Sequence, residues 1–153
     1  MSIAPIVCTI TVKAAPARAF ELFASHIGEW WSKGSTIGKK PHVTIIIEPR
    51  KHGRWFERDA DGAETAWGKV LAFEPPTRLV LGMEINSQFA QDPGCLTEVE
   101  LNFMPAEGGG TKVRLEHRNL ERFGEDAEKM AAALSGGWNK HLGELADYAL
   151  AQA

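Results

Sequence analysis

The first residues of the chain alternate between apolar and polar side chains, which is the pattern of a β-strand with one covered face. The apolar positions of this strand are Ile6, Cys8, Ile10 and Val12. From Pro16 onward the apolar spacing becomes helical, and proline is well tolerated in the first turn of a helix. We therefore expect a short helix, then a second short helix or turn at 29–31 and a loop at 32–41.

The middle of the chain reads as a succession of short strands separated by turn residues. These strands are expected at residues 43–47, 53–58, 64–73 and 78–85. The Asp- and Gly-containing sequence at 59–62 is typical of a hairpin turn. In the first of these strands, Val43, Ile45 and Ile47 are expected to share the covered face.

The clearest alternation occurs in the last hairpin, which follows an irregular polar segment at 86–95. The apolar side of its first strand carries Thr97, Val99, Leu101 and Phe103. After a glycine turn at 108–110, Val113 and Leu115 continue the same pattern on the second strand. One face of this hairpin is therefore expected to be covered and the other solvated. We expect 86–95 to be a loop of the kind that overhangs binding sites.

From about residue 125 to 150 the apolar period changes to that of a helix. One stripe of this helix holds Met130, Leu134, Trp138, Leu142, Leu145 and Ala149. A helix of this length spans about 35–40 Å, enough to cross a sheet. The pattern predicts an α+β fold, in which a curved antiparallel sheet of six or seven strands grips the long C-terminal helix and two short helices follow the first strand.

Composition and charge narrow the possible partners. The chain has 153 residues and a net charge of -3, which favours one soluble domain and gives no basic surface for nucleic acid. No apolar run approaches the roughly 20 residues of a membrane span, so we expect no membrane insertion. Cys8 and Cys95 lie far apart in no metal-binding spacing, which suggests a reducing compartment. We expect a cytoplasmic protein.

Strand phase predicts which polar side chains face the covered side of the sheet. His117 has the same phase as Val113 and Leu115, with Thr97 near it on the neighbouring strand. Glu57 takes the inward phase with Trp55. A carboxyl group buried without a partner has a raised pKa, and such groups are candidates for function. Glu57 and His117 could thus form a polar pair that orients a ligand or moves a proton, or each could be a satisfied core polar group, bonded to the backbone or to the other.

Large aromatic and sulfur-containing side chains could line a cavity between the sheet and the helix. Indole rings combine a large apolar area with a polar N–H, and methionine adapts to varied shapes. Each of them could equally be an ordinary core residue. With the polar candidates, the predicted ligand-binding residues are Trp30, Trp31, Trp55, Glu57, Trp67, Met83, Thr97, His117, Met130, Leu134 and Trp138.

The remaining histidines do not suggest a metal site. His26, His42 and His52 fall in loops or at the ends of elements and show no metal-binding spacing. His141 lies close to the Trp138 stripe of the last helix and could close a pocket, but we expect a boundary position that faces water. We predict no metal and no cofactor.

Several short motifs, in order along nearly the whole chain, carry a resemblance to a known family. They are Ala15-Pro16 with Phe20, Trp30-Trp31, Glu48-Pro49, Gly53-Arg54-Trp55, Gly68-Lys69-Val70, Phe73-Glu74-Pro75-Pro76, Arg78-Leu79-Val80, Gly109-Gly110-Thr111 with Val113, and Gly136-Gly137-Trp138. With these motifs the chain resembles the START-like, birch-pollen-allergen-type (SRPBCC, helix-grip) superfamily. Within it, the chain is most similar to the bacterial branch related to the C-terminal domain of the activator of the Hsp chaperone ATPase (Aha-type).

The resemblance implies a single START-like domain over residues 1–153 with a hydrophobic cavity. Members of the superfamily include lipid and polyketide binders, aromatase/cyclases and chaperone co-factors, without a common set of catalytic residues. We expect non-enzymatic binding of a small hydrophobic or amphipathic molecule by a monomer or homodimer. The alternatives are a co-chaperone-like module that binds a chaperone, and a cyclase- or hydrolase-type enzyme that uses Glu57 and His117 as acid and base.

Overall fold

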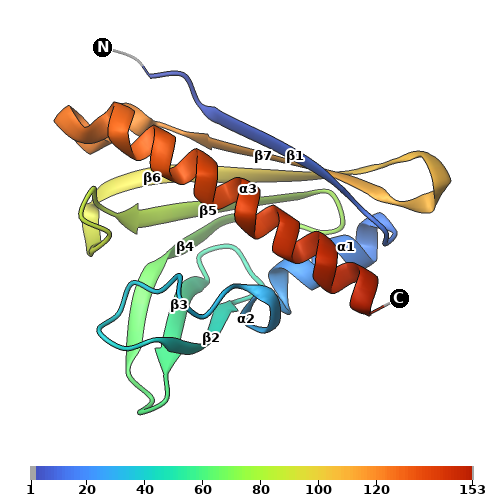
Figure 1. Ribbon diagram of the computed structural model, residues 1–153, viewed down its shortest axis with the longest axis horizontal. Helices are drawn as coiled ribbons and strands as arrows, with labels where there is room; N and C mark the ends of the chain where they lie inside the picture. The colour runs from blue at the N-terminus through green and yellow to red at the C-terminus, as the bar shows by residue number, and fades with distance from the viewer. Residues whose placement is uncertain (1–2, 153) are drawn as a thin grey trace.

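A curled antiparallel sheet wraps around the C-terminal helix in the computed structural model, which describes residues 3–152 (Figure 1). Within that range seven strands form one sheet, in the spatial order β1-β7-β6-β5-β4-β3-β2. The strands are β1 (Ile6–Val12), β2 (His42–Ile47), β3 (Arg54–Asp59), β4 (Glu64–Glu74), β5 (Arg78–Ile85), β6 (Gln91–Pro105) and β7 (Thr111–Arg118). The expected α+β helix-grip architecture is confirmed.

The helices lie on one side of this sheet. Two short helices, α1 (Pro16–Ala24) and α2 (Ile27–Trp30), follow β1, as the sequence predicts. Two 3₁₀ segments, η1 (Glu107–Gly109) and η2 (Leu120–Asp126), flank β7. The long helix α3 (Ala127–Ala151) runs diagonally across the sheet (Figure 1). No helix within residues 3–152 is long and apolar enough to cross a membrane.

The inner face of the sheet forms the core against α3. On β6 the side chains of Thr97, Val99, Leu101 and Phe103 are all buried, as their alternation predicts. The α3 stripe is buried as well, at Met130, Leu134, Trp138, Leu142, Leu145 and Ala149. Removing such apolar area from water contributes about 25 cal/mol per Å², which makes this layer the main source of stability.

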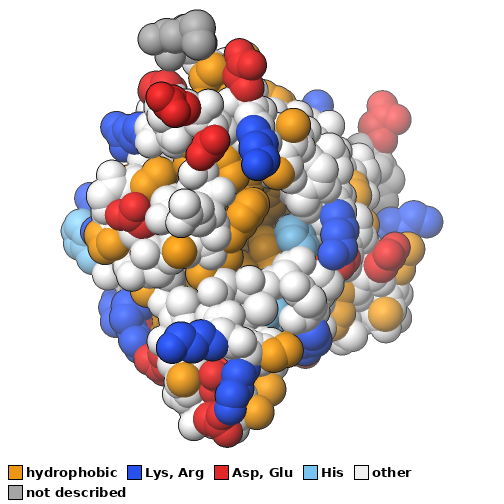
Figure 2. Space-filling model, turned by 60° about the vertical axis from the view of Figure 1, so that its left-hand side comes forward, with side chains coloured by type: hydrophobic (Ala, Val, Ile, Leu, Met, Phe, Trp, Pro, Cys, Tyr) orange, Lys and Arg blue, Asp and Glu red, His pale blue; other side chains and the backbone are white. Residues whose placement is uncertain are grey.

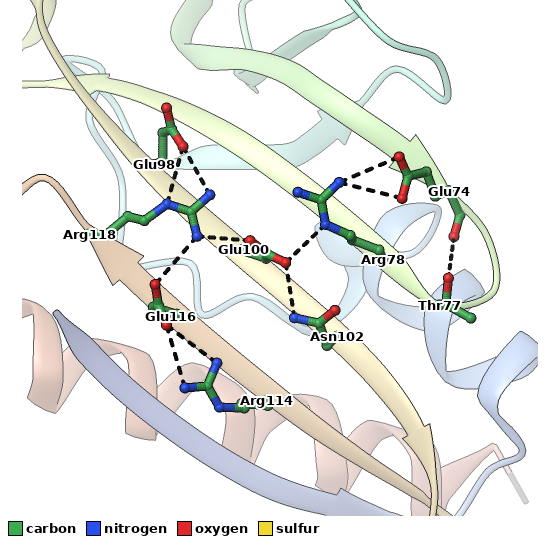
Figure 3. A network of polar contacts seen from close by, with 9 residues as sticks. All are labelled: Glu74, Thr77, Arg78, Glu98, Glu100, Asn102, Arg114, Glu116 and Arg118. Atoms are coloured by element: carbon green, nitrogen blue, oxygen red, sulfur yellow. Dashed lines mark hydrogen bonds and ion pairs between the residues drawn. The ribbon is translucent and has the colours of Figure 1, made fainter.

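The outer face of β5, β6 and β7 carries a network of ion pairs (Figure 3). Glu100 lies at its centre, where it accepts hydrogen bonds from Arg78, Arg118 and Asn102. Burial alone would raise the pKa of Glu100, but these hydrogen bonds outweigh it and lower the pKa to about 2. The solvated face predicted for the last hairpin is therefore a cross-strand charge network.

The expected phase of β2 is wrong at its first residues. Val43 is 50% exposed, whereas His42 is 2% exposed, because the β2–β3 register shifts between His42 and Thr44. A bulge adds one residue to one strand and reverses the side-chain phase beyond it. Ile45 and Ile47 lie past this shift and are buried as expected.

The predicted loop at 86–95 is also partly wrong. Only residues 86–90 form a turn, and β6 begins at Gln91. Three hydrogen bonds close this turn. The Phe89 backbone N–H donates to the Asn86 carbonyl, and the Ala90 backbone N–H donates to the Asn86 side-chain oxygen. The Asn86 backbone N–H donates to the Ala90 carbonyl. Residues 91–94 of β6 lie at an exposed end of the sheet, where a strand needs no apolar face. Their composition is therefore polar, and this polar composition predicts a loop.

The charge network predicts a stability that depends on pH. The Glu100 pKa is lower in the folded protein than its ordinary value of 4.5, so its contribution is complete above pH 4.5 and is lost as the pH falls toward 2. We expect Glu100→Gln to lower the free energy of unfolding at pH 7 by about 1–3 kcal/mol and to flatten its decline between pH 5 and 3. Urea denaturation measures both effects. Glu107→Gln in the exposed hairpin turn is the control, and equal acid sensitivity in both variants would contradict the assignment.

Candidate functional site

A cavity of about 240 Å³ lies between α3, the inner face of the sheet and the segment that joins α2 to β2. Its lining residues are Trp31, Gly34, Ser35, Thr36, Ile37, Trp55, Trp67, Met83, Ile85, Phe89, Ala133, Leu134, Gly137, Trp138 and His141. Figure 2 shows a hollow in the surface with hydrophobic side chains in its wall. The lining contains no Lys, Arg, Asp or Glu, so the wall carries no fixed charge.

Indole rings from three parts of the chain meet at this cavity. Trp31 follows α2, Trp55 and Trp67 come from β3 and β4, and Trp138 comes from α3. The ring centroid of Trp31 is 5.3 Å from that of Trp67 and 5.7 Å from that of Trp138, both edge to face. Such contacts are favourable and keep the ring planes fixed. The wall is thus a rigid aromatic surface.

Glu57 ties the segment over the cavity to the sheet. Its carboxylate accepts hydrogen bonds from the Thr36 hydroxyl at 2.5 Å, the Ile37 backbone N–H at 2.6 Å and the Trp67 indole N–H at 2.8 Å. Glu57 is 1% exposed, so the inward phase predicted for it is confirmed. These three hydrogen bonds satisfy the buried carboxylate and fix its position. Glu57 therefore positions two lining residues, Thr36 and Ile37.

The segment approaches the sheet closely at Gly38. A Cβ atom there would lie 2.7 Å from Thr65 Oγ1 and 2.9 Å from Glu57 Oε2. Only glycine lets the backbone come this near to a buried side chain. The close approach at Gly38 lets the preceding residues lie against the sheet. Residues 34–37, which the sequence indicates only as part of a loop, therefore form one wall of the cavity.

His117 lies behind the wall and connects β7 to β6 and α3. The Trp138 indole N–H donates to His117 Nδ1 at 3.0 Å, and His117 Nε2 lies 2.8 Å from Thr97 Oγ1. Since Nδ1 accepts, the neutral ring carries its proton on Nε2 and donates it to Thr97. Burial lowers the pKa of His117 to about 4, so the ring is neutral at pH 7. The predicted neighbourhood of Thr97 and His117 is confirmed.

The structure does not bring Glu57 and His117 together. The hydrogen bonds of Glu57 go to Thr36, Ile37 and Trp67, while both ring nitrogens of His117 are engaged by Thr97 and Trp138. Each residue is thus a satisfied core polar group, as in the second possibility that the sequence left open. The two do not bond to each other, however, and their partners are mainly side chains and not backbone groups.

Five of the predicted ligand-binding residues do not line the cavity, namely Trp30, Glu57, Thr97, His117 and Met130. The Trp30 indole N–H donates to the Leu22 carbonyl at 2.8 Å within the α1–α2 corner. Met130 is 2% exposed in the core and, like Trp30, does not line the cavity. Of the residues singled out from the sequence, Trp31, Trp55, Trp67, Met83, Leu134 and Trp138 do line it.

The expectation for His141 is wrong, because this residue does not face water. It is 7% exposed, lines the cavity and stacks on Trp31 with ring centroids 3.6 Å apart and planes 12° from parallel. Its Nδ1 lies 2.7 Å from Glu144 Oε1, one helical turn later. Burial lowers the pKa of His141, an effect that Glu144 partly offsets. The stacking partner comes from a distant segment, which is why helical spacing alone placed His141 at the boundary.

Two buried side chains near the cavity hold polar atoms without a hydrogen-bond partner among residues 3–152. Trp55 lines the cavity, and its Nε1 is buried and unpaired. His42 lies edge-on to Trp67, and neither of its ring nitrogens is paired. Burial lowers the pKa of His42 and Lys33 lowers it further, whereas Glu57 and the nearby Trp31 backbone oppose them, so this ring is neutral at pH 7. The Trp31 backbone does not reach hydrogen-bond geometry with either ring nitrogen. Such groups are uncommon in a folded core and mark places where a ligand or water can bond.

No group of three or more His, Cys, Asp or Glu residues in the described part of the chain is arranged to hold a metal ion. The lining that sequence reasoning missed consists of 34–37, Ile85, Phe89, Ala133, Gly137 and His141. A usable signal was present at Gly137 and His141, since residues four apart share one face of a helix and the first of them is adjacent to Trp138. Phe89 belongs to the 86–95 segment, and its place in the lining agrees with the expectation that this segment overhangs a binding site. No comparable signal marks the 34–37 segment.

The anchoring of α3 through Trp138 gives a stability prediction. Trp138 is 3% exposed, and its loss would leave His117 Nδ1 without a donor. We expect Trp138→Ala to lower the free energy of unfolding by about 3–5 kcal/mol, and Trp138→Phe by about 1–3 kcal/mol because it removes only the hydrogen bond and part of the ring. Chemical denaturation measures both. A loss below about 1 kcal/mol for the alanine variant would show that Trp138 is not a core residue.

The role of Glu57 gives a prediction on the segment over the cavity. Glu57→Gln replaces one acceptor oxygen by an N–H donor that faces the Thr36, Ile37 and Trp67 donors. We expect the Ile37 amide hydrogen to exchange about tenfold faster or more, the effect of losing one buried hydrogen bond. Hydrogen exchange followed by NMR measures this rate. With Glu107→Gln as the control, an unchanged Ile37 rate in the Glu57 variant would mean that the segment is held in another way.

Comparisons with known proteins agree with this architecture. Among solved structures, the anthrahydroquino-Gama-pyrone synthase Txn09, complexed with SUM, is 32% identical, with 95% of this chain and 97% of that chain covered and a TM-score of 0.67. The self-sacrificing resistance protein CalC from Micromonospora echinospora is 24% identical, with 98% and 96% covered and a TM-score of 0.72. The protein MLL2253 from Mesorhizobium loti is 19% identical, with 97% and 98% covered and a TM-score of 0.70.

The last two likenesses concern the fold alone. A search of curated proteins gives no match. The family model for the activator of Hsp90 ATPase homolog 1-like protein matches residues 13–149, which include strands β2 to β7, the cavity lining and nearly all of α3. The chain belongs to the activator of Hsp90 ATPase homolog 1-like family.

Proposed function

We propose that the protein binds a small, flat, mainly apolar molecule in the cavity between α3, the sheet and the 34–37 segment. The observation that carries this proposal is the wall itself, in which Trp31, Trp55, Trp67 and Trp138 enclose open space of about 240 Å³. Pockets for small molecules are concave, mostly apolar and supplied with few polar groups. The proposed function is binding, without a chemical step.

The charge of the wall supports a neutral ligand. The lining contains no Lys, Arg, Asp or Glu. Two carboxylates that bond to lining residues, those of Glu57 and Glu144, already accept hydrogen bonds from the protein. A charged ligand would lose its hydration here without finding a counter-charge, which is costly. An uncharged ring system loses little when it leaves water and gains contact with the indoles.

The size of the cavity supports a compact ligand. Its volume of about 240 Å³ lies below the range of about 300–1,000 Å³ common for drug-sized ligands. A molecule of a few fused rings fits such a space better than a long lipid chain. The 32% identity to Txn09, named as a synthase of an anthrahydroquino-pyrone, supports a ligand with a fused aromatic ring system. A chaperone partner and the oligomeric state remain predictions from the sequence.

Filling the cavity from α3 tests the proposal. A Cβ atom added at Gly137 meets no atom within 4 Å, so the side chain of Gly137→Leu would enter the cavity. Leucine also favours a helix over glycine by about 0.8–1 kcal/mol, so the variant should fold at least as well. We expect its affinity for β-methoxynaphthalene, measured by equilibrium dialysis, to fall about tenfold or more relative to the wild type.

Gly136→Leu is the matched control. Gly136 is the preceding residue of α3 and is exposed to solvent. A Cβ atom added there also meets no atom within 4 Å. This variant gains the same helix propensity but leaves the cavity open, so its affinity should equal that of the wild type. If the wild type does not bind the probe, or if Gly137→Leu binds it as well as Gly136→Leu does, the cavity is not the binding site.

A further inference from the structure

His141 and Glu144 form a polar pair at one end of the cavity that the proposed binding does not yet use. The α3 residues that line the cavity are Ala133, Leu134, Gly137, Trp138 and His141, so His141 is the last of them along the helix. Glu144 lies one turn further and accepts a hydrogen bond from His141 Nδ1 at 2.7 Å. The imidazole therefore closes one end of an otherwise apolar space.

The protonation of this pair follows from its hydrogen bonds. A carboxylate can only accept, so Nδ1 of His141 carries the proton that is donated to Glu144. Burial lowers the pKa of His141, with Lys140 and His42 acting in the same direction and Glu144 opposing them, so the ring is neutral at pH 7. In a neutral imidazole with its proton on Nδ1, the other nitrogen, Nε2, is an acceptor.

Nε2 has no hydrogen-bond partner among residues 3–152, although the side chain of His141 is only 9% exposed. It is also absent from the fully enclosed unpaired atoms, which are those of His42 and Trp55, so it retains an open side. Glu144 holds the Nδ1 edge of the ring, and Trp31 covers one ring face at 3.6 Å. The free nitrogen is thus held in a fixed direction at the cavity wall.

Glu144 is itself held in place. Its Oε1 accepts a second hydrogen bond, from the Ser32 backbone N–H at 3.3 Å, which joins α3 to the segment that covers the cavity. A carboxylate on the far nitrogen orients an imidazole and raises the basicity of the nitrogen that faces the ligand. Glu144 is therefore a positioning residue, and His141 is the residue that meets the ligand.

We propose that the cavity is built for a hydroxylated aromatic compound of the phenol class, whose hydroxyl group donates a hydrogen bond to His141 Nε2. This inference rests on the proposed binding function and names the chemistry of its ligand. His141 Nε2 is an acceptor without a donor in the described part of the protein, so a ligand that donates a hydrogen bond to it would bind more tightly. The indole rings of the wall favour a flat ring beside that donor. A weakly acidic hydroxyl makes the stronger hydrogen bond with a basic nitrogen, and it stays neutral in a wall without charge.

A pair of probes that differ only in the donor tests this proposal. β-Naphthol has the hydroxyl, whereas β-methoxynaphthalene has the same ring system and an ether oxygen that cannot donate. We expect the wild type to bind β-naphthol about tenfold more tightly at pH 7, the effect of one net hydrogen bond. In His141→Phe, which keeps an aromatic ring over Trp31, the preference for β-naphthol over β-methoxynaphthalene should disappear, whatever the absolute affinity of the variant for the two probes.

The pH dependence of the same preference tests the pair without relying on the folding of a variant. Protonated His141 donates from Nε2 and cannot accept, so the wild-type preference should persist below pH 6.5 and vanish as the pH falls through the lowered pKa of His141. Glu144→Gln removes the effect that opposes the lowering, so the midpoint should move to a lower pH. A role for Glu144 in packing alone would leave that midpoint unchanged.

The outcomes distinguish the proposed hydrogen bond to His141 from the proposed binding function on which it rests. Equal binding of both probes by the wild type would overturn the hydroxyl acceptor and leave hydrophobic binding intact. A β-naphthol preference that survives in His141→Phe would overturn the assignment to His141, because another group would then accept the hydroxyl hydrogen. Failure of both probes to bind would overturn the proposed function and this inference together.

Discussion

The attachment of α3 to the curled sheet through Trp138 is the constraint on which the rest of the structure depends. Its indole N–H bonds to His117 Nδ1 on β7, and His117 in turn bonds to Thr97 on β6. This chain of hydrogen bonds sets the rotation of the helix about its axis. Because Gly137 and His141 flank Trp138 on the same side, that rotation also decides which helix residues face the cavity. The arrangement of α3 side chains in the cavity wall thus follows from the Trp138–His117 contact within the core.

Polar groups around the cavity are distributed so that the wall stays apolar. The Glu57 carboxylate, the costliest of them to bury, is fully engaged by the segment at 36–37 and by Trp67. His117 is neutral and has a partner on each nitrogen. Satisfied in this way, these groups hold the wall in one shape without attracting charge to it. Among the described residues, His141 Nε2 and Trp55 Nε1 are polar atoms of lining side chains that have no partner.

Much of this fold could be predicted from the sequence because its signals are local. Strict alternation along β6 and β7, and the helical stripe from Met130 to Ala149, depend only on the period of each element. Strand phase also pointed Glu57 and His117 inward correctly. The phase failed at Val43, where a bulge in the β2–β3 ladder inserts one residue that no periodicity reveals.

The cavity itself was less predictable because its wall is assembled from distant contacts. Thr36 and Ile37 are placed by Glu57, some twenty residues later in the chain, and His141 is buried by Trp31 from the other end of it. Loops of polar and small residues carry no sequence pattern that encodes such partners. Indole-rich composition indicated an aromatic cavity, whereas the polar end of the site required the three-dimensional structure.

The most direct test of the account is a crystal structure of the protein with β-naphthol bound. We expect the ring system to lie against the indoles of Trp31 and Trp138 beneath the 34–37 segment, with its oxygen within hydrogen-bond distance of His141 Nε2. A ligand bound elsewhere on the molecule, or an interior in which side chains fill the space between α3 and the sheet, would contradict it.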